Sequence, residues 1–323
     1  MRLGRDYTNC LVFDYLSEAE KKAFKEGKLD IGSMNALALR KAKLDVNRQI
    51  EVTREIGFSH VELDADLPNP YINLSKEERA KIKRVAEYND ITLSLHLPYS
   101  YVGSAVCCMQ EIDRTTAVEL HKKCIEFASD VGAKYVNIHP GSVPFYHAVG
   151  KYKERTHRAL VESLVELAEF ASKHDVALHL ENNVATDNAY SEIGDCVLVI
   201  EDARQQGVDI YFNLDIGHWF TRADAGKEIP SPPEKVMEVL PRELLKEIHL
   251  NDYVPGKKIF HPPLHLEWGL LKRENLRRYA ETMKRKGVEV IVLETSLKNN
   301  EQVLDRKNLL KAESQYVREI FGA

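Results

Sequence analysis

The stretch RTHRALVESLVELAEFASKHDVALHLENN, residues 155–183, contains the unit that decides the fold. In its first part, apolar residues recur at three- and four-residue intervals, which predicts a helix with one buried face. These residues are Leu160, Leu164, Leu167 and Phe170. Residues 176–181 form a short apolar run that ends in Glu181, which is typical of a buried strand. The unit is therefore a helix followed by a strand.

The same unit recurs along the chain. Short apolar or β-branched runs predict eight strands, and charged amphipathic segments between them predict helices. The predicted strands are residues 29–34, 60–63, 91–96, 135–139, 176–181, 210–215, 247–250 and 288–294. The predicted helices include residues 45–56, 76–88, 113–131, 155–173, 274–286 and 305–321. Gly57, Gly132, Gly207 and Gly287 each follow a helix and precede a strand, where a left-handed C-cap is expected.

Strands that alternate with helices form a parallel sheet with right-handed crossovers. The sheet is either open and doubly wound or closed into a barrel. No glycine-rich phosphate fingerprint follows the first predicted strand, so a dinucleotide-binding fold lacks its main support. Eight units favour a single-domain (β/α)₈ TIM barrel over residues 29–323, with residues 1–28 as a short N-terminal extension. Alternatively, residues 9–15 are themselves a strand, and the strand count shifts by one.

The composition excludes several classes of protein. The 323 residues are 44% hydrophobic and 29% charged, with 45 Lys and Arg against 50 Asp and Glu, a formal charge of −5. This balance argues against a partner such as nucleic acid or an anionic membrane. No apolar run approaches the ~20 residues of a membrane span, and the start does not resemble a signal peptide. Five cysteines without a CxxC motif indicate neither a disulfide framework nor a cysteine zinc site. We expect a cytoplasmic protein.

Ionisable side chains close six of the predicted strands. They are His96, His139, Glu181, Asp215 (with His218 three residues later), His249 and Glu294. In a barrel these positions share the C-terminal rim, where such enzymes place their chemistry. A single His there is often structural, and a single Asp often caps the next helix. Acidic or imidazole groups at four successive strand ends instead indicate a divalent cation held by Glu181, Asp215, His249 and Glu294. Zn²⁺, Mn²⁺, Mg²⁺ and Co²⁺ all suit three carboxylates and one imidazole.

Several motifs occur together in a fixed order. They are HLPYS, NIHPGS, LENN, NLDIGH, IHLND, HLEWG and VLET. In this respect the chain, over about residues 29–320, resembles the xylose-isomerase-like TIM-barrel superfamily. That superfamily includes sugar and sugar-phosphate isomerases and epimerases, inosose dehydratases, and apurinic endonucleases of the endonuclease IV type.

The resemblance implies roles for individual residues. Glu181, Asp215, His249 and Glu294 match the shared metal-binding quartet. His218 matches a residue that binds substrate in the epimerases and a further zinc in the endonucleases. His96 and His139 match two ligands of another zinc in the endonucleases, and His265 matches a ligand of the third.

One position departs from the endonuclease pattern. The third zinc site there requires Asp-x-His, and alignment on His265 places Pro263 at the aspartate. Proline has no side-chain ligand atom, so the site loses its carboxylate, unless Asp252 replaces it from the preceding turn.

The loops of the predicted rim carry little positive charge. Residues 64–74, 97–110 and 182–191 contain neither Lys nor Arg, and only Arg222, Lys257 and Lys258 lie near the rim. Because binding of DNA requires contacts to phosphates, this makes DNA a less favoured partner. The rim loops also carry aromatic residues, of which Trp219 and Trp268 are the candidates for packing on a sugar.

We therefore predict a divalent-metal-dependent isomerase or epimerase that enolises a small sugar or polyol-type substrate. Glu181 and Glu294 are the candidate acid–base pair as well as metal ligands, and His218 is a candidate for binding a substrate oxygen. Dehydration uses the same enolate chemistry and stays open. Two alternatives remain: a zinc-dependent apurinic endonuclease of the endonuclease IV type, and a non-catalytic metal- or sugar-binding barrel. The sequence predicts no oligomeric state.

Overall fold

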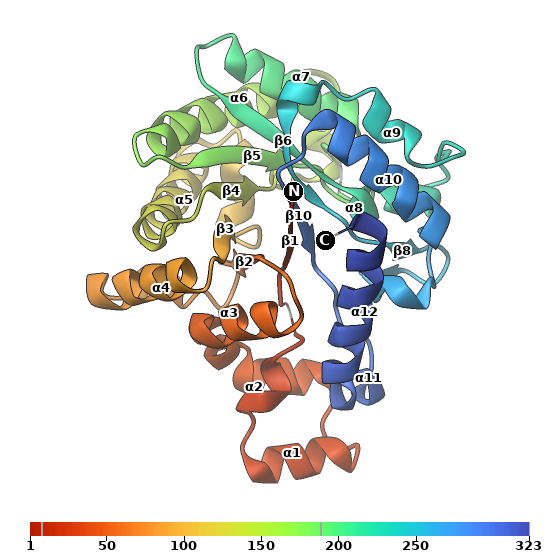
Figure 1. Ribbon diagram of the computed structural model, residues 1–323. Helices are drawn as coiled ribbons and strands as arrows, with labels where there is room; N and C mark the ends of the chain where they lie inside the picture. Colours follow the sequence, from red (N-terminus) through yellow and green to blue (C-terminus); the bar gives the residue numbers. More distant parts are fainter. Residues whose placement is uncertain (8, 188, 323) are drawn as a thin grey trace.

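Eight parallel strands form a closed barrel in the computed structural model, which describes residues 1–7, 9–187 and 189–322. Helices surround the barrel (Figure 1). The strands are β1 (Arg2–Arg5), β2 (His60–Asp64), β3 (Thr92–His96), β4 (Tyr135–Ile138), β5 (Ala177–Glu181), β6 (Ile210–Asp215), β7 (Leu245–His249) and β10 (Val290–Leu293). Their order is β1-β10-β7-β6-β5-β4-β3-β2, which closes on itself. The predicted (β/α)₈ TIM barrel is confirmed.

The helices match the sequence predictions closely where the apolar periodicity is strong. They are α1 (Glu18–Lys25), α2 (Ile31–Leu44), α3 (Val46–Glu55), α4 (Lys76–Tyr88), α5 (Glu111–Val131), α6 (Gly150–Ser172), α7 (Ile193–Arg204), α8 (Ile216–Phe220), α9 (Lys235–Glu238), α10 (Arg273–Lys286), α11 (Asn300–Leu304) and α12 (Arg306–Phe321). Gly132 and Gly287 end α5 and α10 with φ of 76° and 75°, so the predicted left-handed C-caps are present. A short antiparallel hairpin, β8 (Tyr253–Val254) and β9 (Ile259–Phe260), follows β7.

The first predicted strand is wrong. Residues 31–34 are the first turn of α2, and Asp30 caps this helix because its side chain accepts a hydrogen bond from the backbone N–H of Ser33. The first barrel strand is β1, which pairs with β10 and β2. Its sequence RLGR has almost no apolar signal. Residues 1–28 therefore supply a barrel strand and are not an added extension, and the alternative strand at residues 9–15 contains instead the short 3₁₀ helix Val12–Tyr15.

The two faces of the barrel strands differ in polarity. Val61 and Leu63 of β2 belong to the large apolar cluster that includes residues of the surrounding helices. The alternating residues His60 and Glu62 are equally buried but polar. Because side chains alternate between the two faces of a strand, the outer face of the barrel packs against helices, and its interior holds polar groups together with a small separate apolar cluster of Tyr135, Val290 and Val292. The interior layer positions the functional site.

Among the described residues, no helix is both long enough and apolar enough to cross a membrane.

Candidate active site at the barrel mouth

The structure brings together the side chains predicted at the strand ends. His96, Glu181, Asp215 and His249 are the last residues of β3, β5, β6 and β7. His139 follows β4 by one residue and Glu294 directly follows β10. Parallel strands end on one side of a barrel, so all six residues meet at its C-terminal mouth.

The quartet of Glu181, Asp215, His249 and Glu294 is compact. One potential ligand atom from each residue lies within 4.8 Å of the others. His249 Nδ1 lies 3.2 Å from Glu181 Oε2, 3.4 Å from Glu294 Oε2 and 3.9 Å from Asp215 Oδ2. The first three residues are fully buried, whereas the Glu294 side chain is 13% exposed. Glu294 is therefore the member of the quartet that a bound molecule can reach.

The polar atoms of the quartet fit a metal ion. In the described part of the chain, both carboxylate oxygens of Glu181 and Nδ1 of His249 are buried without a hydrogen-bond partner of good geometry. Buried polar atoms normally have such a partner, and an exception calls for an explanation such as a missing ion. Three carboxylates and one imidazole that converge in this way are ligands for a divalent cation.

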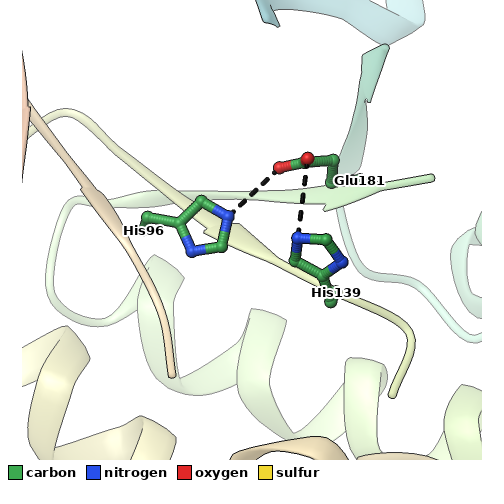
Figure 2. Close-up of side chains that lie close together, drawn as sticks. All are labelled: His96, His139 and Glu181. Atoms are coloured by element: carbon green, nitrogen blue, oxygen red, sulfur yellow. Dashed lines mark ion pairs between the residues drawn. The ribbon is translucent and has the colours of Figure 1, made fainter. Parts of the chain in front are cut away.

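Three further histidines surround Glu181, and Figure 2 shows two of them, His96 and His139, pointing at its carboxylate. His96 Nε2 lies 3.3 Å from Oε2 and His139 Nε2 lies 3.5 Å from Oε1. His218 Nδ1 lies 3.1 Å from Oε1. One ligand atom each from His96, His139 and Glu181 also lies within 4.8 Å of the others.

The outer nitrogens of His96 and His139 are already engaged. His96 Nδ1 is 3.0 Å from the carbonyl of Leu97, and His139 Nδ1 is 3.0 Å from Asn183 Oδ1. A carbonyl only accepts, and so does Asn183 Oδ1, so each Nδ1 carries a proton. In a neutral ring each Nε2 then carries a lone pair, and so do the oxygens of the Glu181 carboxylate that it faces. Such a contact is favourable only when a proton or a metal ion lies between the two atoms. This second group has the composition of a cation site.

Burial and mutual charge set the pKa values of these groups. Burial opposes ionisation of Glu181, but His249 and His139 hold the pKa of this carboxyl well below its usual range. Burial also opposes the charged form of His218, but Asp215 and Glu181 raise its pKa to about 9. Burial lowers the pKa of His139 to about 4. His218 is therefore a cationic hydrogen-bond donor at neutral pH, whereas His139 is neutral.

The two oxygens of Asp215 have different surroundings. Its Oδ1 accepts a hydrogen bond of 2.6 Å from the backbone N–H of His218 and caps α8, while Oδ2 faces the quartet. Asn251, which the sequence analysis did not single out, donates from Nδ2 to Asp215 Oδ2 at 2.6 Å and to Glu294 Oε2 at 2.8 Å. Asn251 Oδ1 accepts from the Glu294 backbone N–H at 2.9 Å. One amide thus fixes two carboxylates of the quartet.

A cavity of about 370 Å³ opens above the cluster. Its lining residues are Asp6, Asp64, His96, Tyr99, His139, Gly141, Ser142, Asn183, Val184, Asp187, His218, His261 and Glu294. The volume falls within the range of small-molecule sites. Among the described residues that line it there is no Lys or Arg, and four carboxylates face it together with the cationic His218. Asp6 directly follows β1. The sequence did not indicate Asp6 as a cavity residue, because the first strand was predicted at residues 29–34.

The loop histidine that lies at the mouth is not the one that the alignment with the endonucleases indicated. His261, not His265, lines the cavity, with Nε2 3.8 Å from Asp215 Oδ2 and Nδ1 3.7 Å from Glu294 Oε2. One ligand atom each of Asp215, His218 and His261 lies within 4.8 Å of the others. His265 is half-buried in a 3₁₀ turn and is not among the cavity residues.

Asp252 does not replace the ligand that is absent at Pro263. Its carboxylate accepts hydrogen bonds from the backbone N–H groups of Gly269, Leu270 and Leu271 and holds that loop. The two predicted tryptophans are also outside the cavity: Trp219 is 3% exposed, and Trp268 is 43% exposed but absent from the lining.

The fold and this mouth define a TIM barrel with a candidate metal centre at the carboxyl ends of its strands. The chain belongs to the xylose isomerase-like TIM barrel family, whose model matches residues 50–320. This confirms the family resemblance on which several of the site predictions were based.

Curated relatives of this chain include two different enzyme types. The chain is 26% identical over 143 residues to the L-ribulose-5-phosphate 3-epimerase UlaE of Shigella flexneri, covering 41% of this chain and 46% of that protein. It is 32% identical over 142 residues to a probable endonuclease 4 of Thermotoga petrophila, covering 42% and 46%. The matched regions thus span about half the length of each relative.

Among solved structures, D-psicose 3-epimerase with D-tagatose from Clostridium cellulolyticum H10 has a similar fold, with a TM-score of 0.68, 14% identity and 99% of each chain covered. At this identity the likeness shows the fold alone.

Proposed function

We propose that this chain is a divalent-metal-dependent isomerase or epimerase of a small sugar or polyol-type substrate that carries no phosphate. The observation that supports it most is the quartet of buried ligands whose one accessible member, Glu294, lines a cavity of small-molecule size. A divalent ion held by Glu181, Asp215, His249 and Glu294 supplies the polarisation of a carbonyl that acidifies the neighbouring C–H bond. The similarity to the epimerase UlaE agrees with an isomerase or epimerase, although UlaE is named for a phosphorylated sugar, so the absence of a phosphate is argued from the cavity alone.

The charge of the cavity supports an unphosphorylated substrate. A phosphate ester is normally bound by Arg, Lys or backbone N–H groups. Asp6, Asp64 and Asp187 line this cavity instead, and the described lining contains no Arg or Lys. Asp64 is paired with Lys43 Nζ at 2.7 Å. Hydroxyl groups can donate to the carboxylates of the lining, whereas a phosphate dianion would face like charges from Asp187 and Glu294.

Glu294 is the candidate residue for moving the substrate's carbon-bound proton. Burial raises the pKa of its carboxyl above the usual range, toward the pH at which a general base operates best. Asn251 holds its Oε2 in place. Glu181 lies deeper, beneath His96, His139 and His218, and is the candidate for the opposite proton transfer. His218 lines the cavity with a proton available for a substrate oxygen.

The test is exchange of the substrate's carbon-bound proton with solvent. Protein loaded with Mn²⁺ is incubated in D₂O with a panel of ketoses and inososes, and deuterium at the carbon next to the carbonyl is followed by NMR. Glu294→Gln keeps an oxygen ligand but removes the base, so exchange should slow by about 10²–10⁴-fold while metal is partly retained. His157→Ala, on the outer helix α6, serves as a control because His157 pairs with Asp202 and belongs to none of the ligand groups among the described residues.

Metal-loaded wild-type protein that exchanges no proton in any of these substrates would contradict enolisation and favour a binding barrel without turnover. Wild-type exchange in Glu294→Gln would move the base to another residue, with Glu181 the next candidate.

A second candidate function, an apurinic endonuclease, is supported by the group of His96, His139 and Glu181, and by the similarity to a probable endonuclease 4. The anionic cavity lining opposes it, because each phosphate contact requires a donor. Incision of duplex DNA with one abasic site, together with elemental counting of bound metal, separates the two: incision with three metals indicates the nuclease.

A further inference from the structure

A second polar layer lies inside the barrel below the quartet. Glu62 of β2, Asn137 of β4 and Glu247 of β7 are all fully buried there. Asn137 Nδ2 donates hydrogen bonds to Glu62 Oε1 and to Glu247 Oε1. Because these strands are not neighbours, the contacts cross the barrel interior. Two carboxylates so deep in a core are destabilising unless partners hold them, so their presence requires an explanation.

His249 connects this layer to the quartet. Its Nδ1 points at Glu181 and Glu294, as described above, and its Nε2 lies 3.0 Å from Glu62 Oε2. Asn137 Nδ2 lies 3.5 Å from the same nitrogen, at the long limit of a hydrogen bond. In the part of the chain that the structure describes, Glu62 Oε2 has no hydrogen bond of good geometry, so its 3.0 Å contact with Nε2 is within hydrogen-bond distance but not well aligned, and no other group donates to this oxygen.

We propose that Glu62 is a positioning residue for His249 as a metal ligand. This inference rests on the quartet's binding a metal, as the proposed function requires. An imidazole that binds a metal through Nδ1 carries its proton on Nε2, and a carboxylate that accepts this proton fixes the tautomer and the ring orientation and makes the ligand more basic. Asn137 holds the other oxygen of Glu62, so the carboxylate is itself oriented.

The neighbouring carboxylate provides a natural comparison. Glu247 Oε1 is 3.9 Å from His249 Nε2, beyond hydrogen-bond distance, and Glu247 Oε2 lies 3.6 Å from His60 Nε2 on the other side. Both carboxylates are fully buried and both accept from Asn137. They differ in their distance from the ligand histidine, so only Glu62 should tune metal binding strongly.

The experiment compares Glu62→Gln with Glu247→Gln in the full chain. Metal-free protein is titrated with Co²⁺ against a chromophoric chelator, the visible absorption of bound Co²⁺ is recorded, and thermal melting of the metal-free form reports on folding. Removing a residue that supports a ligand typically weakens metal binding 10–100-fold. We expect a loss of this size and an altered Co²⁺ spectrum in Glu62→Gln, and affinity close to wild type in Glu247→Gln. Glu62→Leu, which removes the acceptor altogether, should lose more than Glu62→Gln.

Three outcomes would overturn the inference. The first is a folded Glu62→Gln protein with wild-type Co²⁺ affinity and spectrum. The second is an equal loss in Glu247→Gln, which would indicate buried charge in general. The third is a wild-type protein that binds no Co²⁺, which would also remove the metal from the proposed function. Because no readout here is turnover, a protein that binds Co²⁺ as expected but exchanges no sugar proton refutes only the proposed enzyme activity.

Discussion

The two ends of the barrel have cavities of similar size but opposite chemistry. The N-terminal end has the larger one, about 490 Å³, lined by residues that include His60, Thr92, Tyr135 and Glu289. Polar groups there have partners: the two nitrogens of His60 lie 2.8 Å from Thr92 Oγ1 and 2.9 Å from Ser94 Oγ. Glu289 accepts from Tyr135 at 2.6 Å and from Lys246 at 2.7 Å.

At the mouth the corresponding atoms are left open. Both oxygens of Glu181, Nδ1 of His249 and Nε2 of His261 are buried without a hydrogen bond of good geometry among the described residues. Cavity volume therefore does not distinguish the two ends, and hydrogen-bond satisfaction does. The N-terminal end, where His60 completes its hydrogen bonds within the protein, is structural, and the end where several ligand atoms converge without partners is the candidate site. His179, which packs on Tyr135, also lacks partners for both ring nitrogens among the described residues, but it belongs to none of the ligand groups.

The largest expected effect comes from replacing one histidine at each end of the barrel by alanine and comparing the two variants. His249→Ala removes a quartet ligand, so we expect a loss of metal affinity greater than the 10–100-fold typical of a supporting residue. His60→Ala should leave metal affinity unchanged but reduce the free energy of unfolding by about 1–3 kcal/mol, because Thr92 and Ser94 lose their partner. Elemental analysis and chemical denaturation of both variants check this. Equal metal content in His249→Ala and wild type would remove the site assignment.

The two cavities also differ in the charged side chains that line them. Arg2, Lys134 and Lys284 line the N-terminal cavity, whereas the described lining of the mouth contains no Arg or Lys and includes four carboxylates. We expect kcat/KM for a free ketose to exceed that for its phosphate ester by at least about tenfold, since like charges in a site cost several kcal/mol. Asp187→Asn, which removes one lining carboxylate, should narrow this ratio. Parallel assays on the ketose and its phosphate measure it, and a preference for the phosphate would contradict the unphosphorylated substrate.

How much the sequence could predict depends on the range of the interactions involved. Glu181, Asp215, His249 and Glu294 were predictable because each closes a strand with a clear apolar run, and parallel strands end together. Strand β1 was not, because RLGR has little apolar character and its strand conformation depends on pairing with β10 and β2.

The supporting residues were hidden for a different reason. Asn251 and Glu62 act through hydrogen-bond distance to other strands, and one-dimensional spacing does not encode these distances. His261 joins the site only because the hairpin of β8 and β9 folds the chain back over the mouth. Sequence order pointed to His265 because the match to HLEWG is local, whereas the position of a loop residue depends on the path of the whole loop.

The smallest expected effect separates these two loop histidines, which are four residues apart. His261 has a positive φ of 48° and contacts Asp215 and Glu294 at 3.7–3.8 Å, so His261→Ala should weaken Co²⁺ binding or change its spectrum. His265 is half-buried outside the cavity, so His265→Ala should bind metal as wild type does and change the free energy of unfolding by only about 0.5 kcal/mol. Co²⁺ titration and denaturation of the matched pair measure both quantities. If His265→Ala lost metal and His261→Ala did not, the loop would have to place residue 265 at the mouth when metal is bound. Pro263 would then occupy the position of the missing aspartate, and the alignment with the endonucleases would describe this loop better than the geometry does.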